Sequence, residues 1–184
     1  MRLFIATSFP AAALRPVNER VARVKSKLPP AAWVRPEAQH LTFAFLGEKE
    51  EPLVAELAPV VERALAKVPR FEATVTGCGF FPNPRHARVG WVGVQPEASF
   101  NAVAAAVRDA VQSCGIELDR GEFRAHLTLM RIRDRWPPAC IDTFNGALRD
   151  FTSEPFTIDN ITLFSSRLDP NGAVHTPLRK FALA

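Results

Sequence analysis

The tripeptide His-Leu-Thr occurs twice in this 184-residue chain, as His40–Thr42 and again as His126–Thr128. Each copy opens a short apolar run typical of a β-strand, His-Leu-Thr-Phe-Ala-Phe in the first case and His-Leu-Thr-Leu-Met-Arg in the second. Side chains alternate between the two faces of a strand, so the histidine and threonine of each copy point the same way while the leucine points into the core. The sequence therefore predicts two similar strands, each with the same pair of polar side chains on one face.

The segments around the first copy alternate between predicted strands and helices. Apolar residues at helical spacing indicate two helices, the second of which contains Pro59 and is expected to kink there. A loop is expected before the first copy, because Pro36 restricts the preceding residue to extended conformations. The predicted elements are a strand over 2–8, a helix over 11–28, a loop over 33–37, the first His-Leu-Thr strand ending at Gly47, and a helix over 51–67.

The rest of the chain repeats this theme. The predicted elements are strands over 71–75 and 89–94 that flank a loop at 80–84, a helix over 98–114, the second His-Leu-Thr strand, a helix around 138–149, and closing strands over 156–164 and 174–183 around a turn at 168–172. No Ser/Gly-rich linker divides the chain. We therefore expect one bilobal domain over 1–184 of the α+β class, with two pseudo-symmetric lobes, antiparallel sheets around a central cleft and helices packed outside.

Composition limits the class of protein without identifying its ligand. Lys and Arg number 23 against 19 Asp and Glu, a mild positive excess that fits an anionic ligand. The cysteines are odd in number and form no CxxC pair, so reduced thiols are expected rather than a disulfide framework or a zinc site. The apolar start is short and interrupted by Thr7, Ser8 and Pro10, which indicates a buried strand rather than a signal peptide. No stretch has the apolar length of a bilayer span, so we expect a soluble, cytoplasmic protein. We also expect a monomer.

The duplicated polar pair suits acid–base chemistry at a phosphate. Imidazole titrates near neutrality, so one neutral histidine can take a proton from water while a second, protonated one gives a proton to a departing alkoxide. Each threonine hydroxyl can donate to a phosphoryl oxygen and stabilise the charge of the transition state. This arrangement needs no metal, and two histidines without a matching cluster of Asp, Glu or Cys make a poor zinc set. His86, in a predicted loop, and His175, on the last predicted strand, have no threonine two residues on and are expected at exposed or edge positions.

At these residues the chain resembles the 2H phosphoesterases, and specifically the bacterial and archaeal RNA 2′,3′-cyclic phosphodiesterases, also called LigT-like proteins or 2′-5′ RNA ligases. The family's paired His-x-Thr-x motifs match both copies, and the likeness covers essentially the whole chain. Further matching segments are Met1–Ala6, Trp33–Glu37, Phe45–Gly47, Phe80–Arg85, Val89–Val94, Phe123–Ala125 and Leu163–Leu168. Two positions depart from the family pattern: Ala125, where proline is frequent, and Ala44, where a larger polar residue is frequent and which strand alternation places on the His40 face.

The resemblance implies hydrolysis of a terminal RNA 2′,3′-cyclic phosphate to a 2′-phosphate, with no cofactor. By motif, His40 is implied as the proton donor to the leaving 3′ oxygen and His126 as the proton acceptor that activates water. Thr42 and Thr128 are implied as the residues that hold the phosphate. Arg131, five residues after His126, falls where the family has an arginine that stacks on a base, although strict alternation would point it away from His126.

Three alternatives stay open at this stage. The same site run in reverse would join a 5′-hydroxyl to the cyclic phosphate and form a 2′–5′ linkage. A related enzyme acting on a small cyclic nucleotide or an ADP-ribose cyclic phosphate would need the same motifs. A module that binds RNA ends without turning them over is less favoured, because a pure binder has no need for two proton carriers.

Overall fold

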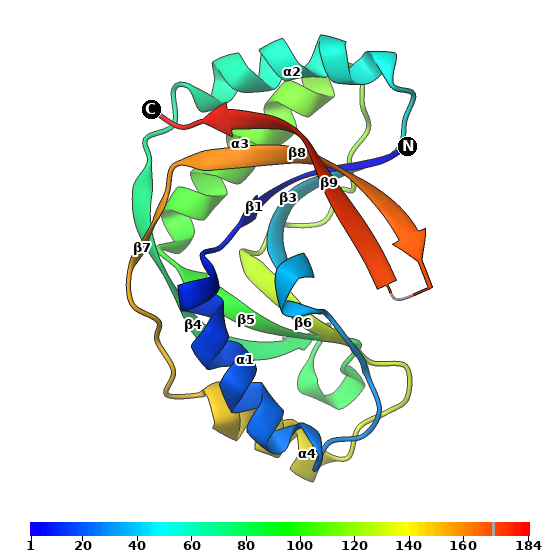
Figure 1. The fold of residues 1–184 in the computed structure, drawn as a ribbon, viewed down its shortest axis with the longest axis vertical. Helices are drawn as coiled ribbons and strands as arrows, with labels where there is room; N and C mark the ends of the chain where they lie inside the picture. The colour runs from blue at the N-terminus through cyan, green and yellow to red at the C-terminus, as the bar shows by residue number, and fades with distance from the viewer. Residues whose placement is uncertain (171) are drawn as a thin grey trace.

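The computed structural model describes residues 1–170 and 172–184, which form two antiparallel sheets with helices on their outer sides (Figure 1). The first sheet has the strand order β3 (His40–Glu48), β1 (Arg2–Ser8), β8 (Asn160–Asp169) and β9 (Gly172–Ala182). The second has the order β2 (Ala32–Trp33), β6 (His126–Arg131), β5 (Val89–Gln95), β4 (Phe71–Phe81) and β7 (Phe156–Ile158). The predicted α+β class with antiparallel sheets and outer helices is confirmed.

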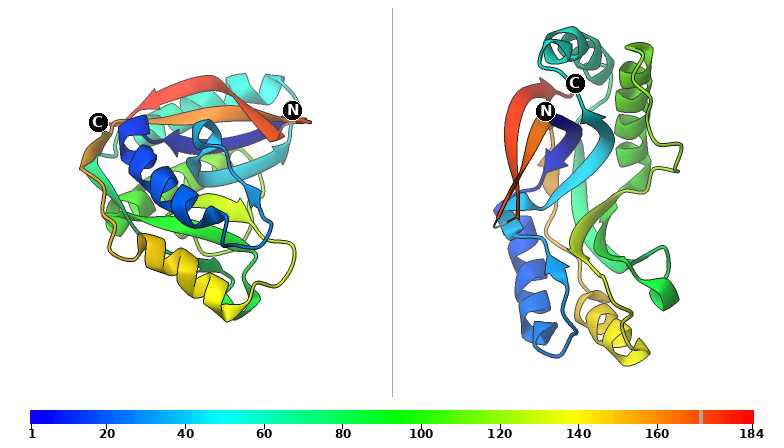
Figure 2. Two further views of the ribbon diagram at one scale, coloured as in Figure 1. Left: turned by 60° about the horizontal axis from the view of Figure 1, so that its bottom comes forward. Right: turned by 90° about the vertical axis from the view of Figure 1, so that its right-hand side faces the viewer.

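The two lobes interleave along the chain rather than following one another. The first sheet takes its strands from the beginning and the end of the sequence, and the second takes most of its strands from the middle. The helices cross over in the same way: α2 (Pro52–Leu65) and α3 (Glu97–Ser113) pack together over the first sheet, while α1 (Ala11–Lys25) and α4 (Pro138–Leu148) pack over the second. Figure 2 shows the two helix pairs at opposite ends of the molecule. Neither lobe is therefore a contiguous half of the sequence.

Several predicted elements differ from the structure. The strand predicted over 71–75 continues to Phe81, because a bulge around Gly77, with φ of 73°, lets pairing with β5 resume beyond it. The segment predicted as one strand over 156–164 is divided between β7 in the second sheet and β8 in the first. The chain therefore passes from one lobe to the other within this segment. The predicted turn at 168–172 contains Asn171, which lies outside the described residues, and Gly172 already belongs to β9.

The core lies between the sheets and their helices and is built from the apolar positions of the predicted pattern. The residues that follow each motif histidine, Leu41 and Leu127, are fully buried, as alternation along the strand predicts. Trp33, predicted in a loop, belongs to the short strand β2, which pairs with the end of β6. Within the described residues, no helix has both the length and the apolar character that a membrane crossing requires.

Candidate active site

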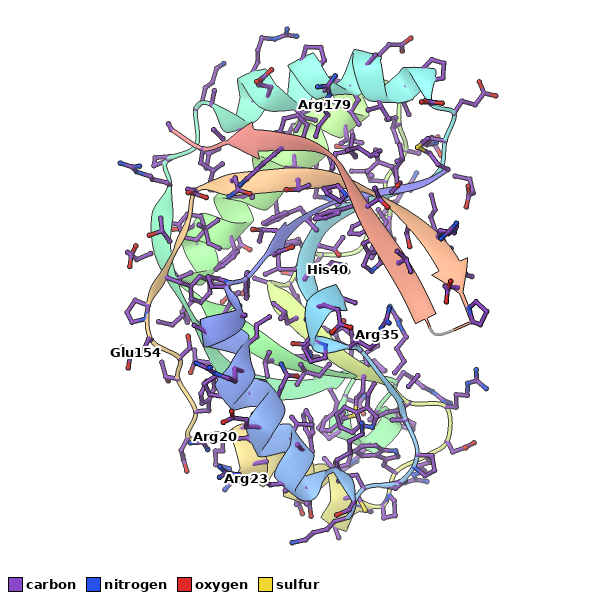
Figure 3. All side chains as sticks on the ribbon, in the orientation of Figure 1. Arg20, Arg23, Arg35, His40, Glu154 and Arg179 are labelled. Atoms are coloured by element: carbon purple, nitrogen blue, oxygen red, sulfur yellow. The ribbon has the colours of Figure 1, made fainter. Side chains whose placement is uncertain are left out.

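The two His-Leu-Thr motifs lie on neighbouring strands of different sheets and line one cavity. β3 forms an edge of the first sheet, and β6 lies against it from the second. The cavity between the lobes has a volume of about 790 Å³, and its lining includes His40, Thr42, His126 and Thr128. Figure 3 shows His40 near the middle of the molecule, below strand β8. The structure therefore brings together both pairs of polar residues that the sequence placed on two separate strands.

A bulge at the same place in each strand decides which side chains reach the cavity. The pairing of β3 with β1 skips Phe43, and the pairing of β6 with β5 skips Leu129. Two consecutive side chains are buried after each threonine, and alternation then resumes in the opposite phase. We call the part of the cavity around each motif histidine a half-site. In the His40 half-site the residue of the motif strand that lines the cavity after the histidine and the threonine is consequently Phe45, and in the His126 half-site it is Arg131.

These bulges change two expectations from the sequence. Ala44 does not share the His40 face, because the bulge turns it into the core, where it is 2% exposed. Arg131, which strict alternation points away from His126, lines the cavity for the same reason. The signal for both was present in the sequence: Phe43-Ala44 and Leu129-Met130 are two apolar residues in succession, a pattern that interrupts strict alternation.

Both motif histidines are oriented by the same backbone contact. His40 Nδ1 lies 2.7 Å from the carbonyl oxygen of Ala38, and His126 Nδ1 lies 2.6 Å from that of Arg124. A carbonyl oxygen only accepts hydrogen bonds, so Nδ1 must carry the proton and donate it. In the neutral ring, Nε2 is then the nitrogen with the free lone pair. Each ring is thus fixed in the tautomer whose Nε2 can accept a proton.

Aromatic rings surround each histidine and remove it from water. The Phe4 ring centroid lies 4.9 Å from that of His40, and the His175 ring stands edge-on to His40, also at 4.9 Å. In the other half-site, Phe81 stands edge-on to His126 at 4.9 Å, with Trp91 at 6.4 Å. The sequence correctly placed His175 on an edge strand, β9, but did not predict that its ring lines the cavity. His86, by contrast, is exposed, as predicted.

This burial disfavours the charged form of both histidines in the free protein. Desolvation lowers the pKa of His40 from 6.5 to about 4, with a further lowering by His175, against an opposing effect of the Ala38 carbonyl. Burial also lowers the pKa of His126, and the positive charge of Arg131 adds to this, while the Arg124 carbonyl opposes it. At neutral pH both rings are therefore neutral before a ligand binds.

Acidification is expected to destabilise the fold through His40. In the unfolded chain this histidine takes up a proton below pH 6.5, whereas in the folded chain it does so only near pH 4. The free energy of unfolding should therefore fall by up to about 3 kcal/mol as the pH drops from 7 to 4. Urea denaturation at a series of pH values measures this effect, with His40→Gln, which does not titrate, as the comparison. An equally steep pH dependence in the variant would show that His40 is not its source.

The cavity is positively charged and presents free hydroxyl groups. Arg2, Arg35 and Arg131 contribute to its lining, and among the described residues that line it none carries a carboxylate. The hydroxyls of Thr42 and Thr128 have no hydrogen-bond partner in the described part of the chain. Figure 3 shows Arg35 on the same side as His40, whereas Arg20, Arg23 and Arg179 lie farther away. This lining favours an anion with oxygen atoms that accept hydrogen bonds.

The polar side chains that line the cavity are imidazoles, hydroxyls and guanidinium groups. Over residues 1–170 and 172–184, no three or more His, Cys, Asp or Glu side chains come together as a set that could hold a metal ion. The nitrogen that a metal would take on His40 and His126 is Nε2, since Nδ1 of each ring is occupied by a carbonyl oxygen. The arrangement offers proton carriers and hydrogen-bond donors instead.

Comparison with known proteins shows the family of this chain. The family model of the 2′-5′ RNA ligase superfamily matches residues 11–170. The chain belongs to this superfamily. A relative in Archaeoglobus fulgidus named RNA 2′,3′-cyclic phosphodiesterase is 31% identical, over 98% of this chain and 99% of its own length. A relative of the same name in Thermotoga maritima is 28% identical, over 97% and 93% of the two chains.

Solved structures of known proteins have a similar fold. A Thermus thermophilus protein matches with a TM-score of 0.75 and 27% identity, over 100% of this chain and 98% of its own. Escherichia coli LigT complexed with 3′-AMP matches with a TM-score of 0.74 and 25% identity, over 99% and 97% of the two chains. These two structures therefore share the overall fold of this chain.

Proposed function

We propose that this superfamily member hydrolyses RNA 2′,3′-cyclic phosphate ends to 2′-phosphates without a metal ion. The observation that carries the proposal is the convergence of both His-x-Thr pairs on a cationic cavity. The names of the relatives in Archaeoglobus fulgidus and Thermotoga maritima support the same substrate class. A cyclic phosphodiester fits the site's chemistry, since opening its ring needs a base, an acid and an oriented phosphate.

In the proposed reaction each histidine moves one proton through Nε2. His126 takes a proton from water as the water oxygen bonds to phosphorus, and His40 gives a proton to the 3′ oxygen as the bond from phosphorus to that oxygen breaks. The phosphate remains on the 2′ oxygen. Thr42 and Thr128 hold the phosphoryl oxygens, and their hydroxyls donate more strongly as negative charge builds up in the transition state.

The low pKa of His40 in the free protein has to rise for this residue to act as the acid. The phosphodiester carries a negative charge, and a negative charge placed beside a desolvated imidazole favours the imidazolium. The bound substrate thus supplies the counter-charge that the carboxylate-free lining lacks. The His40 ring is therefore neutral in the free protein and becomes protonated when the substrate binds.

The pH dependence of kcat/KM is expected to be bell-shaped, with its maximum on the acid side of pH 6.5. This parameter reports the free enzyme, in which burial lowers the pKa of both His40 and His126. The profile of kcat is expected to extend to higher pH, because bound substrate raises the pKa of His40. Initial rates from pH 4 to 9 at limiting and saturating substrate test this. A kcat/KM that rises steadily through neutrality would contradict the assignment of one neutral and one charged histidine.

We further propose that Arg131 and Phe45 contact the terminal nucleotide. They occupy equivalent places after the two bulges, and both line the cavity. Phe45 is 64% exposed, although it is a large apolar side chain. An exposed aromatic face and a guanidinium plane are the two groups on which nucleobases stack most readily.

We also propose that the whole chain acts as one bilobal domain, in the cytoplasm and as a monomer.

Phosphorus NMR of a nucleoside 2′,3′-cyclic phosphate incubated with the protein and excess EDTA tests the function directly. Conversion to the 2′-phosphate alone is the expected result and fixes which bond breaks. Formation of the 3′-phosphate, or loss of turnover on adding EDTA, would overturn the proposed reaction. A parallel incubation of RNA ends with a 5′-hydroxyl acceptor measures the reverse reaction, which would appear as a 2′–5′ linkage.

A further inference from the structure

The two half-sites hold their histidines with rings of different chemistry. Phe81 on β4 stands edge-on to His126, with ring centroids 4.9 Å apart and an interplanar angle of 85°. His175 on β9 stands edge-on to His40 with the same distance and the same angle. An apolar ring and a polar ring thus play the same packing role on the two sides of the cavity.

Each of these two rings also packs on an aromatic side chain of the strand next to its histidine's own strand, stacked for Phe81 and edge-on for His175. Phe81 packs on Trp91 of β5, the strand that pairs with β6, and the two centroids are 5.1 Å apart. His175 packs on Phe4 of β1, the strand that pairs with β3, at 5.0 Å. Since packing alone is satisfied by phenylalanine in the His126 half-site, packing does not account for a histidine in the other one.

The surroundings of the two ring nitrogens of His175 indicate which of them can donate a hydrogen bond to a ligand. Nδ1 is buried and has no hydrogen-bond partner in the described part of the chain. Buried N–H groups without a partner are rarer in proteins than buried acceptors without one, so we assign the proton of the neutral ring to Nε2. Burial lowers the pKa of His175, which keeps the ring neutral. Because the ring lines the cavity, Nε2–H is the donor that remains for a bound molecule.

We propose that His175 binds the ribose of the terminal nucleotide by donating Nε2–H to a ribose oxygen. This inference rests on the proposed function, in which His40 protonates the 3′ oxygen and the ribose therefore lies on the His40 side. In the proposed reaction His126, on the opposite side, acts on a water molecule, and the apolar ring of Phe81 is sufficient there. The difference between the two edge-on rings then follows from what each half-site receives.

Binding of two ligands that differ in the ribose tests this inference. Calorimetric titration compares adenosine 2′-phosphate with inorganic phosphate in the wild-type protein and in His175→Phe, which keeps the edge-on aromatic packing and removes the donor. The variant should bind the nucleotide about 3- to 10-fold more weakly, the usual effect of one hydrogen bond. Its affinity for inorganic phosphate should stay close to that of the wild type. His175→Gln, which restores an N–H donor, should recover part of the lost affinity.

A matched control and two contrary outcomes make the test decisive. His86→Phe makes the same change at an exposed histidine outside the cavity and should alter neither affinity. Unchanged nucleotide binding in His175→Phe would overturn the inference. Equal weakening of nucleotide and phosphate would overturn it too, because it would mean that His175 acts only through the position of His40. Binding is measured without turnover, so a failure of the proposed hydrolysis would be seen separately in the NMR experiment.

Discussion

His40→Ala and His126→Ala are each expected to lower kcat by about 10²–10⁴-fold, the range that general acid–base catalysis contributes. Both rings line the cavity, and both have Nδ1 occupied by a backbone carbonyl, so that proton transfer is confined to Nε2. Alanine provides no group that can carry the proton. Initial rates on a nucleoside 2′,3′-cyclic phosphate measure the loss, and circular dichroism with thermal unfolding checks that each variant is folded.

The residual activities also distinguish the acid from the base. Loss of the acid removes the alkaline limb of the pH–rate profile, so His40→Ala should keep only the acidic limb, and His126→Ala only the alkaline one. The double variant should be little slower than either single variant, because residues that act as a unit are not additive. His86→Ala should retain wild-type activity. Wild-type kcat in either cavity variant would exclude the two-histidine mechanism.

Local patterns in the sequence predicted most of the elements and singled out four polar residues that the structure places around one cavity. The helices and most strands follow from apolar spacing, and the repeated His-Leu-Thr placed one histidine and one threonine on the same face of each strand. Those side chains depend only on alternation over three residues, which a bulge further along does not disturb. The prediction of both lobes facing a shared cleft agrees with the cavity that the four residues line.

What the sequence did not predict depends on pairings between distant segments. The crossing at Asp159, where the chain leaves the second sheet for the first, is visible only once β8 pairs with β1. Two successive apolar residues in each motif strand indicate an interrupted alternation, but the register shifts that bring Phe45 and Arg131 into the cavity belong to strand pairs, because a bulge is defined by two residues opposite one. His175 reaches His40 from the far edge of the sheet, at a sequence separation that no local pattern covers.

Removing the threonine hydroxyls is expected to have the second largest effect. Thr42→Val and Thr128→Val keep the β-branched shape that suits a strand but delete the donor. Each should raise the barrier of the chemical step by about 2–4 kcal/mol, the effect of losing one donor to a developing oxyanion. This corresponds to a decrease in kcat of about 30- to 1000-fold. Thr→Ser at either position, which restores the hydroxyl, should recover most of the rate.

The split between kcat and KM shows whether these hydroxyls act on the transition state. The phosphodiester already carries charge in the ground state, so some increase in KM is expected, but the larger change should be in kcat because the charge on the phosphoryl oxygens grows as water adds. Thr157→Val makes the same substitution on an exposed position of β7, outside the cavity, and should change neither parameter. A rise in KM alone would mean that the threonines only bind the phosphate. We expect Thr42→Val and Thr128→Val to change kcat and KM to a similar extent, because each hydroxyl follows its histidine on the same kind of bulged strand.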